Sequence, residues 1–300
     1  MFVVTYRKIF FALSGLFVAF SIGAVAFLGL PLGIDFTGGS ILEVSYDEAR
    51  PEKAVLENRL NQLDIGSYSL LKTGETGYLL RMRETTENEL PSILNTLEVE
   101  GSTPTQERFS SIGPTIGQEL RTKALIAIFT VVLVIILYVA FAFRKVSEPV
   151  SSWKYGLIAI LALLHDIIIP TGVFAVLAYL TGAEVDILFV MALLAILGYS
   201  VNDTIVVFDR VRENLRLNKE NKKKEDFVIT VGRSLDQTLT RSINTSLTTA
   251  LVLIALFFIG PPSTRDFAIV LLAGVVAGSY SSIALAAPLL ASLERWGKRG

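Results

Sequence analysis

One aspartate, Asp203, lies inside an apolar stretch that is long enough to cross a membrane. The stretch Ile187–Phe208 contains no other residue with a formal charge, and Asn202 comes directly before the aspartate. A carboxylate near the centre of a bilayer costs about 2.5–3.5 kcal/mol on insertion scales, so such residues usually line a polar path or have a partner. The position of Asp203 therefore indicates ion movement rather than simple anchoring.

A candidate partner for this carboxylate opens the next apolar stretch. Arg241 is followed at helical spacing by Asn244, Thr245 and Thr248, which predicts a polar stripe on one helix face. Burial raises the pKa of a carboxyl group, whereas a nearby arginine, which stays protonated, lowers it. If Asp203 and Arg241 approach and separate, the acid would release a proton when paired and bind one when apart. We therefore expect the two helices to face each other across a narrow hydrated seam. The alternative is a structural cluster that only holds helices together.

A second titratable pair, His165-Asp166, lies in another apolar stretch, upstream of Pro170. A histidine in an apolar helix can relay protons, but this pair could equally bond the backbone of a neighbouring helix. Gly274 and Gly278 have the spacing of a helix-packing motif, and we interpret them as structural.

Composition places the chain among integral membrane proteins. Hydrophobic residues make up 52% of it and the mean hydropathy is +0.56, which is high for a soluble protein. Cysteine is absent and there is one histidine, so a thiolate site, a disulfide and a multi-histidine metal site are excluded. We expect no cofactor, no metal, no enzymatic activity and no nucleic-acid partner; the net charge of −1 implies nothing about nucleic acid.

Six stretches are long enough to span a bilayer, which takes about 20 apolar residues. They are Ile9–Gly29, Ala124–Phe143, Gly156–Leu180, Ile187–Phe208, Ser242–Gly260 and Phe267–Leu293. The apolar core of the first is longer than that of a signal peptide, so we interpret it as an uncleaved anchor.

The distribution of lysine and arginine predicts the orientation of these spans. With a cytoplasmic N-terminus, the basic residues gather inside, at Arg7/Lys8, Arg144/Lys145/Lys154, Arg210–Arg241 and Arg295/Lys298/Arg299. The short outer connections then hold Glu184, Asp186 and Asp266 with one cation, Arg265. Both termini are therefore predicted to be cytoplasmic.

The predicted organisation has three parts. Residues 1–30 form the cytoplasmic N-terminus and the first span, residues 31–122 an extracytoplasmic domain, and residues 123–300 the other five spans with a cytoplasmic loop over 209–240. The outer segment is too long to lack structure. Its patterns predict strands and helices in the order β-α-β-β-α-β of a ferredoxin-like α+β fold. The predicted ranges are Ile41–Tyr46, Glu52–Leu63, Tyr68–Lys72, Tyr78–Arg83, Glu87–Leu97 and Gln106–Ile112.

The cytoplasmic loop is predicted to be a solvated helix-loop-helix. Its basic run Lys222–Lys224 suits contact with anionic lipid or ribosomal RNA, but ordinary positive-inside topology explains it better.

Five strings in order resemble the SecF family, the smaller partner of SecD in bacterial protein export, which is related to the resistance–nodulation–division transporters. They are GIDFTGG (Gly33–Gly39), SIGPTIGQEL (Ser111–Leu120), LHD (Leu164–Asp166), LGYSVNDTIVVFDRVREN (Leu197–Asn214) and TRSINTSLTT (Thr240–Thr249). The resemblance covers essentially the whole chain.

This resemblance implies a function beyond what the residues alone indicate. It implies a twelve-span complex with SecD in the bacterial cytoplasmic membrane, associated with the SecYEG channel and YajC. Such a complex uses the proton gradient, or a sodium gradient in some marine species, to help move preproteins. The membrane aspartate and arginine of the family fall on Asp203 and Arg241. The two junction strings, with Gly33, Asp35, Gly38, Gly39, Gly113, Pro114 and Gly117, would pass helix movement to the outer domain.

Two other functions compete with this one. Asp166 and Asp203 on separate spans could share a proton as in an aspartyl protease, but the catalytic signature of intramembrane proteases is absent. A proton-coupled exporter of small molecules or lipids is the other alternative, although such transporters carry two six-span halves and larger outer domains.

Overall fold

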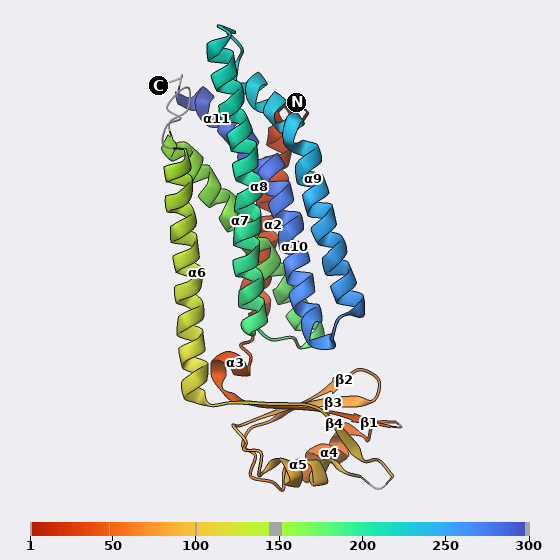
Figure 1. The fold of residues 1–300 in the computed structure, drawn as a ribbon. Helices are drawn as coiled ribbons and strands as arrows, with labels where there is room; N and C mark the ends of the chain where they lie inside the picture. The colour runs from red at the N-terminus through yellow and green to blue at the C-terminus, as the bar shows by residue number, and fades with distance from the viewer. Residues whose placement is uncertain (1, 48, 100, 144–151, 298–300) are drawn as a thin grey trace. The chain divides into compact units, whose positions relative to one another are not determined.

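The computed structural model describes residues 2–47, 49–99, 101–143 and 152–297. The chain forms two compact units (Figure 1). The helical unit contains residues 1–30, 126–183 and 188–300, and the α+β unit contains Pro31–Leu125 together with Glu184–Ile187. Arg144, Lys145, Lys298 and Arg299, which enter the predicted orientation, lie outside the described residues.

Helices of membrane-spanning length occupy all six predicted stretches, and several of them begin earlier or end later than their apolar cores. The elements are α1 (Phe2–Thr5), α2 (Arg7–Leu28), α6 (Pro114–Ala142), α7 (Ser152–Thr181), α8 (Ile187–Glu220), α9 (Phe227–Ile259), the 3₁₀ turn η1 (Pro262–Thr264), α10 (Arg265–Ser281), the π-helical turn η2 (Ser282–Ala286) and α11 (Ala287–Gly297). The sixth span is therefore one continuous path through α10, η2 and α11.

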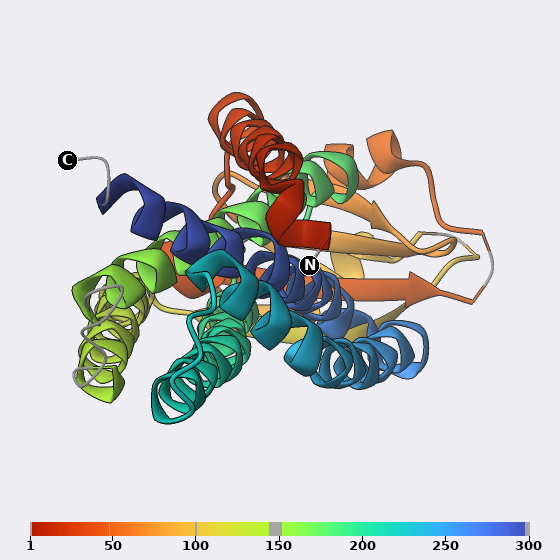
Figure 2. The same ribbon diagram turned by 90° about the horizontal axis from the view of Figure 1, so that it is seen from above.

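The helical unit has a packed centre and an exposed periphery. In the most apolar 18-residue stretch of each span, the buried share of residues is 50% in α7, 56% in α8 and 50% in the α10–α11 span. The corresponding share is 11% in α2, 6% in α6 and 11% in α9. In the view from above, α9 lies at the edge of the bundle (Figure 2). Lipid or another membrane protein must cover the exposed apolar faces of the peripheral helices.

Small residues let the central helices approach one another. A Cβ atom at Gly274 would lie 2.2 Å from Ile196 of α8, and one at Gly278 would lie 3.1 Å from the Cβ atom of Ser200. Gly172 of α7 is also tightly packed, because a Cβ there would lie 2.4 Å from the Cα atom of Ser21 in α2. These contacts are consistent with the structural interpretation of Gly274 and Gly278 and add Gly172, which had no sequence signal.

We predict that Gly172→Ala destabilises the chain by about 1–3 kcal/mol, as overpacking does when backbone cannot yield. Gly156→Ala, in the same helix with open space at its Cβ position, is the matched control and should be neutral or slightly stabilising. Thermal unfolding in detergent measures both. Equal midpoints for the two variants would contradict the packing of α2 on α7.

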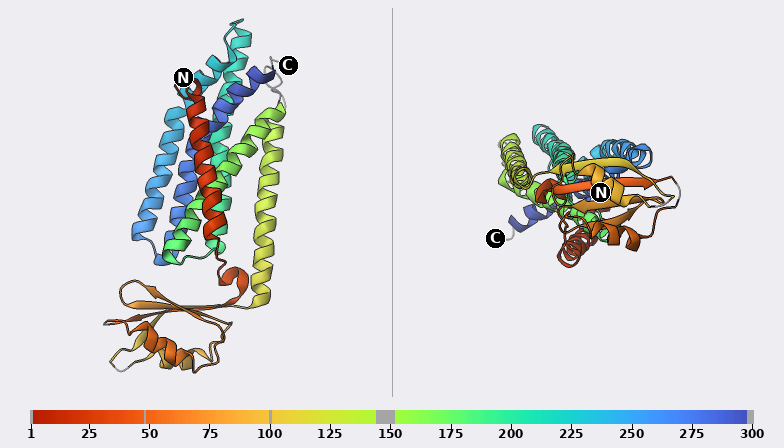
Figure 3. Two further views of the ribbon diagram at one scale, coloured as in Figure 1. Left: turned by 180° about the vertical axis from the view of Figure 1, so that it is seen from behind. Right: turned by 90° about the horizontal axis from the view of Figure 1, so that it is seen from below.

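The α+β unit has the predicted strand and helix order. Its elements are α3 (Ile34–Thr37), β1 (Gly39–Tyr46), α4 (Lys53–Leu60), β2 (Ser69–Thr73), β3 (Gly77–Met82), α5 (Leu90–Leu97) and β4 (Pro104–Ile112). The sheet order is β2-β3-β1-β4 and every pairing is antiparallel, which is the ferredoxin-like arrangement. Helices α4 and α5 cover one face of the sheet (Figure 3).

The alternation of side chains along β1 and β3 builds the core of this unit. Leu42, Val44 and Leu80 are fully buried between the sheet and its two helices, together with Leu56 and Leu97. Because successive strand residues point to opposite faces, the intervening positions of β1 lie on the face away from α4 and α5. The short α3, between Gly33 and Gly38, was not predicted.

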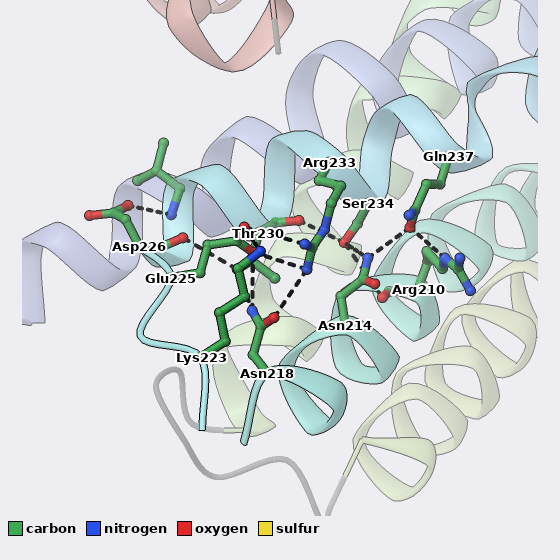
Figure 4. A network of polar contacts seen from close by, with 11 residues as sticks. Arg210, Asn214, Asn218, Lys223, Glu225, Asp226, Thr230, Arg233, Ser234 and Gln237 are labelled. Carbon is green, nitrogen blue, oxygen red and sulfur yellow. Dashed lines mark hydrogen bonds and ion pairs between the residues drawn. The ribbon is translucent and has the colours of Figure 1, made fainter. Parts of the chain in front are cut away.

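The α8–α9 hairpin corrects the prediction of a solvated loop. Helix α8 continues to Glu220 and α9 begins at Phe227, so the helix-loop-helix itself is confirmed, but its interior is packed. Asn214, Thr230 and Ser234 are buried. Figure 4 shows these residues in a network that also includes Asn218, Glu225, Arg233, Gln237 and Arg210. Polar side chains that bond one another can be buried without the cost of lost hydration, which polarity in the sequence does not reveal.

Glu225 organises the loop end of this network. Burial opposes its charge, but hydrogen bonds from Asn218, Thr230 and Lys223 and the charge of Arg233 lower the pKa of Glu225 below its ordinary value. A carboxylate with a depressed pKa in the folded state stabilises the fold above its ordinary titration range, and that contribution is lost as the pH falls through the folded value.

We therefore predict that Glu225→Gln lowers the free energy of local unfolding of the hairpin at neutral pH. The variant should also lose less of this free energy than the wild type on acidification. Glu220→Gln is the control, because Glu220 is 60% exposed and pairs with Arg216, a contact worth little. Hydrogen exchange of the hairpin between neutral pH and about pH 4 tests this. An acid response of the Glu225→Gln variant as large as that of the wild type would refute it.

Candidate functional site

Asp203 lies in the packed centre of the helical unit and is bonded by two serine hydroxyls. Its side chain is 8% exposed. Ser242 of α9 donates to Oδ1 at 2.6 Å, and Ser282 of η2 donates to Oδ2 at 2.7 Å. No ion pair of this carboxylate occurs among the described residues. A serine hydroxyl both donates and accepts, so the site can accommodate either protonation state of the acid.

Asp166 is the second carboxylate of the same interior and has the same kind of surroundings. It is fully buried, and its Oδ2 accepts from Ser200 of α8 and from Ser281 of α10, the latter at 2.7 Å. Nδ1 of His165 lies 2.7 Å from Oδ1, while Nε2 of this buried ring has no partner within the described part of the chain. His165 and Asp166 thus contact each other directly, and their part in proton movement stays a prediction.

Four serines outside the predicted set of site residues hold these two acids. Ser200, Ser242, Ser281 and Ser282 are each at most 1% exposed. Serine is common in membrane helices as packing material, so its type gives no signal. Spacing could have found two of them, since Ser242 follows Arg241 directly and Ser200 lies three positions before Asp203.

The predicted polar stripe of α9 does not face Asp203 in this structure. Arg241, Asn244, Thr245 and Thr248 are exposed, and both threonines donate to carbonyls of their own helix. The face of α9 that turns inward carries Ser242 and Ser246 instead. The two predicted stripes therefore do not face each other in the conformation described, and the pairing of Asp203 with Arg241 stays a prediction.

The polar surface of α8 beside Asp203 is also directed outward. Asn202 is exposed, and Gly198, one turn earlier, has open space where a side chain would lie. Together with Arg241 and Asn244 of α9, these positions place polar and small residues on exposed surfaces of membrane-length helices. An exposed arginine in a span is costly in lipid, so a protein or water must meet it.

The two junction strings meet in the α+β unit. Gly38 has φ +76°, and a Cβ there would lie 2.7 Å from the Cα atom of Pro114. A Cβ at Gly117 would lie 2.8 Å from the backbone nitrogen of Gly38, and one at Gly39 would lie 2.8 Å from a carbonyl oxygen of β3. Gly113 is constrained more loosely, by the side chain of Glu84 at 3.2 Å. Close backbone contact explains why glycine occupies these positions.

The first junction string, Gly33–Gly39, also forms hydrogen bonds with the connection that precedes α8. The backbone N–H of Gly33 donates to the carbonyl of Val185 at 2.8 Å, and Asp35 accepts from the N–H of Ile187 at 2.8 Å. Ile187 is the first residue of α8, so Asp35 satisfies one of the free N–H groups at a helix start. Arg81 of β3 forms a 2.6 Å ion pair with Glu184 in that connection. The sequence placed Asp35 in a junction string but did not predict this contact with the start of α8.

Comparisons with known proteins identify the family. A family model described as "Protein export membrane protein SecD/SecF, C-terminal" matches residues 93–296, and one described as "SecD/SecF GG Motif" matches residues 23–49. A protein translocase subunit SecF from Thermobaculum terrenum is 39% identical over 97% of this chain and 93% of its own length. The chain belongs to the SecF family. A SecF from Haemophilus influenzae is 34% identical over 93% of this chain and 82% of that protein.

Two solved structures of SecDF share the fold of this SecF-family chain. The translocon-associated membrane protein SecDF from Thermus thermophilus superposes with a TM-score of 0.81 at 30% identity, covering 97% of this chain. A structure of SecDF in a super-membrane-facing form gives a TM-score of 0.66 at 31% identity, covering 99% of this chain. This chain spans 38% of each of those longer chains. The predicted family and the predicted membrane fold are thus confirmed.

The junction contact gives a testable consequence. An alanine at position 38 would be strained by the positive φ, which costs about 1–3 kcal/mol. We predict that Gly38→Ala destabilises the α+β unit by more than this amount, because the new methyl group also clashes with Pro114. Gly74→Ala is the control, since Gly74 also has positive φ but open space around it. Hydrogen exchange of β1 and β3 in the whole chain measures both, and equal effects would contradict the contact between the two strings.

Proposed function

We propose that this chain is the SecF-type half of a proton-driven SecD–SecF assembly that assists Sec-dependent protein export. The observation that carries the proposal is the buried pair of carboxylates, Asp166 and Asp203, each bonded by serine hydroxyls and by no cation of fixed charge in the described structure. Such acids can exchange protons without losing their partners, because each hydroxyl can turn from donor to acceptor.

Asp203 and Arg241 are the working pair in this proposal. The conformation described has them apart, with Arg241 exposed and Asp203 bonded to Ser242 and Ser282. In the second conformation, α9 turns so that Arg241 approaches the carboxylate and displaces its proton, since a nearby cation favours the ionised form. Each proton that moves through a potential of about 100 mV delivers about 2.3 kcal/mol, enough to bias such an equilibrium.

The remaining predicted polar residues extend the path on both sides of this pair. Asn202, Asn244, Thr245 and Thr248 are exposed on α8 and α9, where they would line a seam with the second half of the assembly. His165 would pass a proton to Asp166 through Nδ1, which lies 2.7 Å from Oδ1, after its Nε2 atom takes one up; Nε2 is buried and has no partner in the described chain. The outward direction of the stripe on α9 thus supports a SecD-type partner, with lipid covering the apolar faces.

The α+β unit would convert this change into work on a preprotein. The strings around Gly38 and Pro114 meet, and Gly33 and Asp35 bond the connection to α8, so three connections to the helices join at one place. A change in helix packing would reach the α+β unit through these hinges. In this assembly the unit lies outside the bacterial cytoplasmic membrane, both termini are cytoplasmic, and SecYEG and YajC are the neighbouring partners.

Transport by proteoliposomes tests the proposal directly. With SecD and SecYEG present, Asp203→Asn and Arg241→Met should each lower proton flux and preprotein release by about tenfold, within the range typical of coupling between sites. Asp209→Asn and Arg216→Met are the controls, because both residues are exposed on the cytoplasmic extension of α8. Undiminished transport in both test variants would refute the proposal. Loss of drug or lipid export with intact preprotein release would favour an exporter of the resistance–nodulation–division type.

A further inference from the structure

Four consecutive residues, Ser279 to Ser282, connect the sixth span to the helices around it. Ser279 bonds Ser246 of α9, and Tyr280 donates to the carbonyl of Phe10 in α2 at 2.9 Å. The next two residues, Ser281 and Ser282, donate to Asp166 of α7 and Asp203 of α8. Successive helical residues point about 100° apart, so one turn can reach several neighbours.

Each of the last two hydroxyls has a second acceptor within reach. The hydroxyl of Ser281 lies 3.1 Å from the carbonyl oxygen of Gly278, and that of Ser282 lies 3.0 Å from the carbonyl oxygen of Ser279. A hydroxyl has one proton to donate, so it must favour one acceptor. An ionised carboxylate is the stronger acceptor, and the shorter distances of 2.7 Å to the acids agree with this.

The backbone is irregular where these two serines lie. The α-helix ends at Ser281, and the π-helical turn occupies Ser282–Ala286 before α11 begins. Such turns are rare and are often found at functional sites. A turn of this kind differs from an α-turn by the pairing of a few carbonyls, so a change in which groups bond the preceding carbonyls can alter it.

We propose that Ser281 and Ser282 are positioning residues that transmit the protonation state of Asp166 and Asp203 to this π-helical turn. When an acid binds a proton, its new O–H group becomes a donor. The serine hydroxyl then accepts that hydrogen and donates its own to the carbonyl of Gly278 or Ser279. No covalent bond changes apart from the transfer of the incoming proton to the carboxylate.

The adjacency of the two serines makes the acids one coupled unit. A change at Asp203 alters Ser282, and with it the turn that begins beside Ser281, the donor to Asp166. This inference rests on the proposed function for its purpose in transport, but its structural content can be tested without transport.

The other ionisable groups near this unit are few among the described contacts. His165 of α7 bonds Asp166, and the ring of Tyr280 stacks on it at a centroid distance of 6.0 Å. Tyr199 of α8 donates to Ser246 rather than to a carboxylate. Ser242 and Ser282 are the partners of Asp203 from α9 and η2. A control must therefore replace His165, because a change in its own protonation could also affect Asp166.

Hydrogen exchange of the peptide that contains the π-helical turn tests the inference in the intact SecD–SecF complex. Asparagine is a mimic of a neutral acid because its amide also offers a donor group and an acceptor. We expect Asp203→Asn to change the exchange rate of amides 282–287 by about fivefold or more, the lower end of typical coupling. That response should be lost in the double variant with Ser282→Ala, and the response to Asp166→Asn should be lost with Ser281→Ala. Both should persist in a His165→Phe background.

Ser292→Ala is the matched control, since the hydroxyl of Ser292 bonds a carbonyl of its own helix at 2.8 Å. If an alanine variant does not fold, Ser282→Cys keeps the volume and offers only a weak donor. The inference is overturned if Asp203→Asn leaves the turn unchanged, or if its effect is the same without the Ser282 hydroxyl. Loss of transport in Asp203→Asn with no change in the turn would refute this inference alone, whereas the reverse would refute the proposed function alone.

Discussion

The burial of two acids among hydroxyl groups is the constraint on which the helical unit depends. Asp166 is fully buried and Asp203 is 8% exposed, and an unpaired charge in such a place costs several kcal/mol. Hydroxyl donors from α8, α9, α10 and η2 satisfy the two carboxylates. To place four serines within hydrogen-bond distance, the helices must approach closely, and Gly274 and Gly278 permit this between α10 and α8.

The same constraint connects packing with function. Helices that meet through hydroxyls around an acid have two satisfied arrangements, one for each protonation state, whereas an apolar interface has one. The exposed stripe of Arg241 on α9 is the complementary feature, since a cation in a membrane span needs a partner. Within the α+β unit, Gly38 and Gly117 lie in close contact, where backbone rather than side chains sets the geometry.

Much of this organisation could be predicted from the sequence, for physical reasons. Long apolar runs indicated the six spans. In the α+β unit, strands showed alternation and helices showed helical periodicity, because each element buries one face, and these patterns indicated the order of its elements. Asp203 could be selected from the sequence because it is a charged residue within a membrane span, where burial of a charge is costly. Which face of α9 points toward Asp203 could not be predicted. Arg241 and Ser242 are adjacent in the sequence but lie about 100° apart around the helix. The serine partners, the π-helical turn and the close packing of Gly172 on Ser21 depend on contacts between distant segments.

In the proposed mechanism, the carboxyl group of Asp203 changes its protonation state as the complex works. Infrared difference spectroscopy of the reconstituted SecD–SecF complex, recorded when a proton gradient is imposed, measures this directly. We expect a carbonyl stretching band of a neutral carboxylic acid that changes with the gradient and is absent in Asp203→Asn. A spectrum in which imposing the gradient leaves every band assigned to Asp203 unchanged would contradict it.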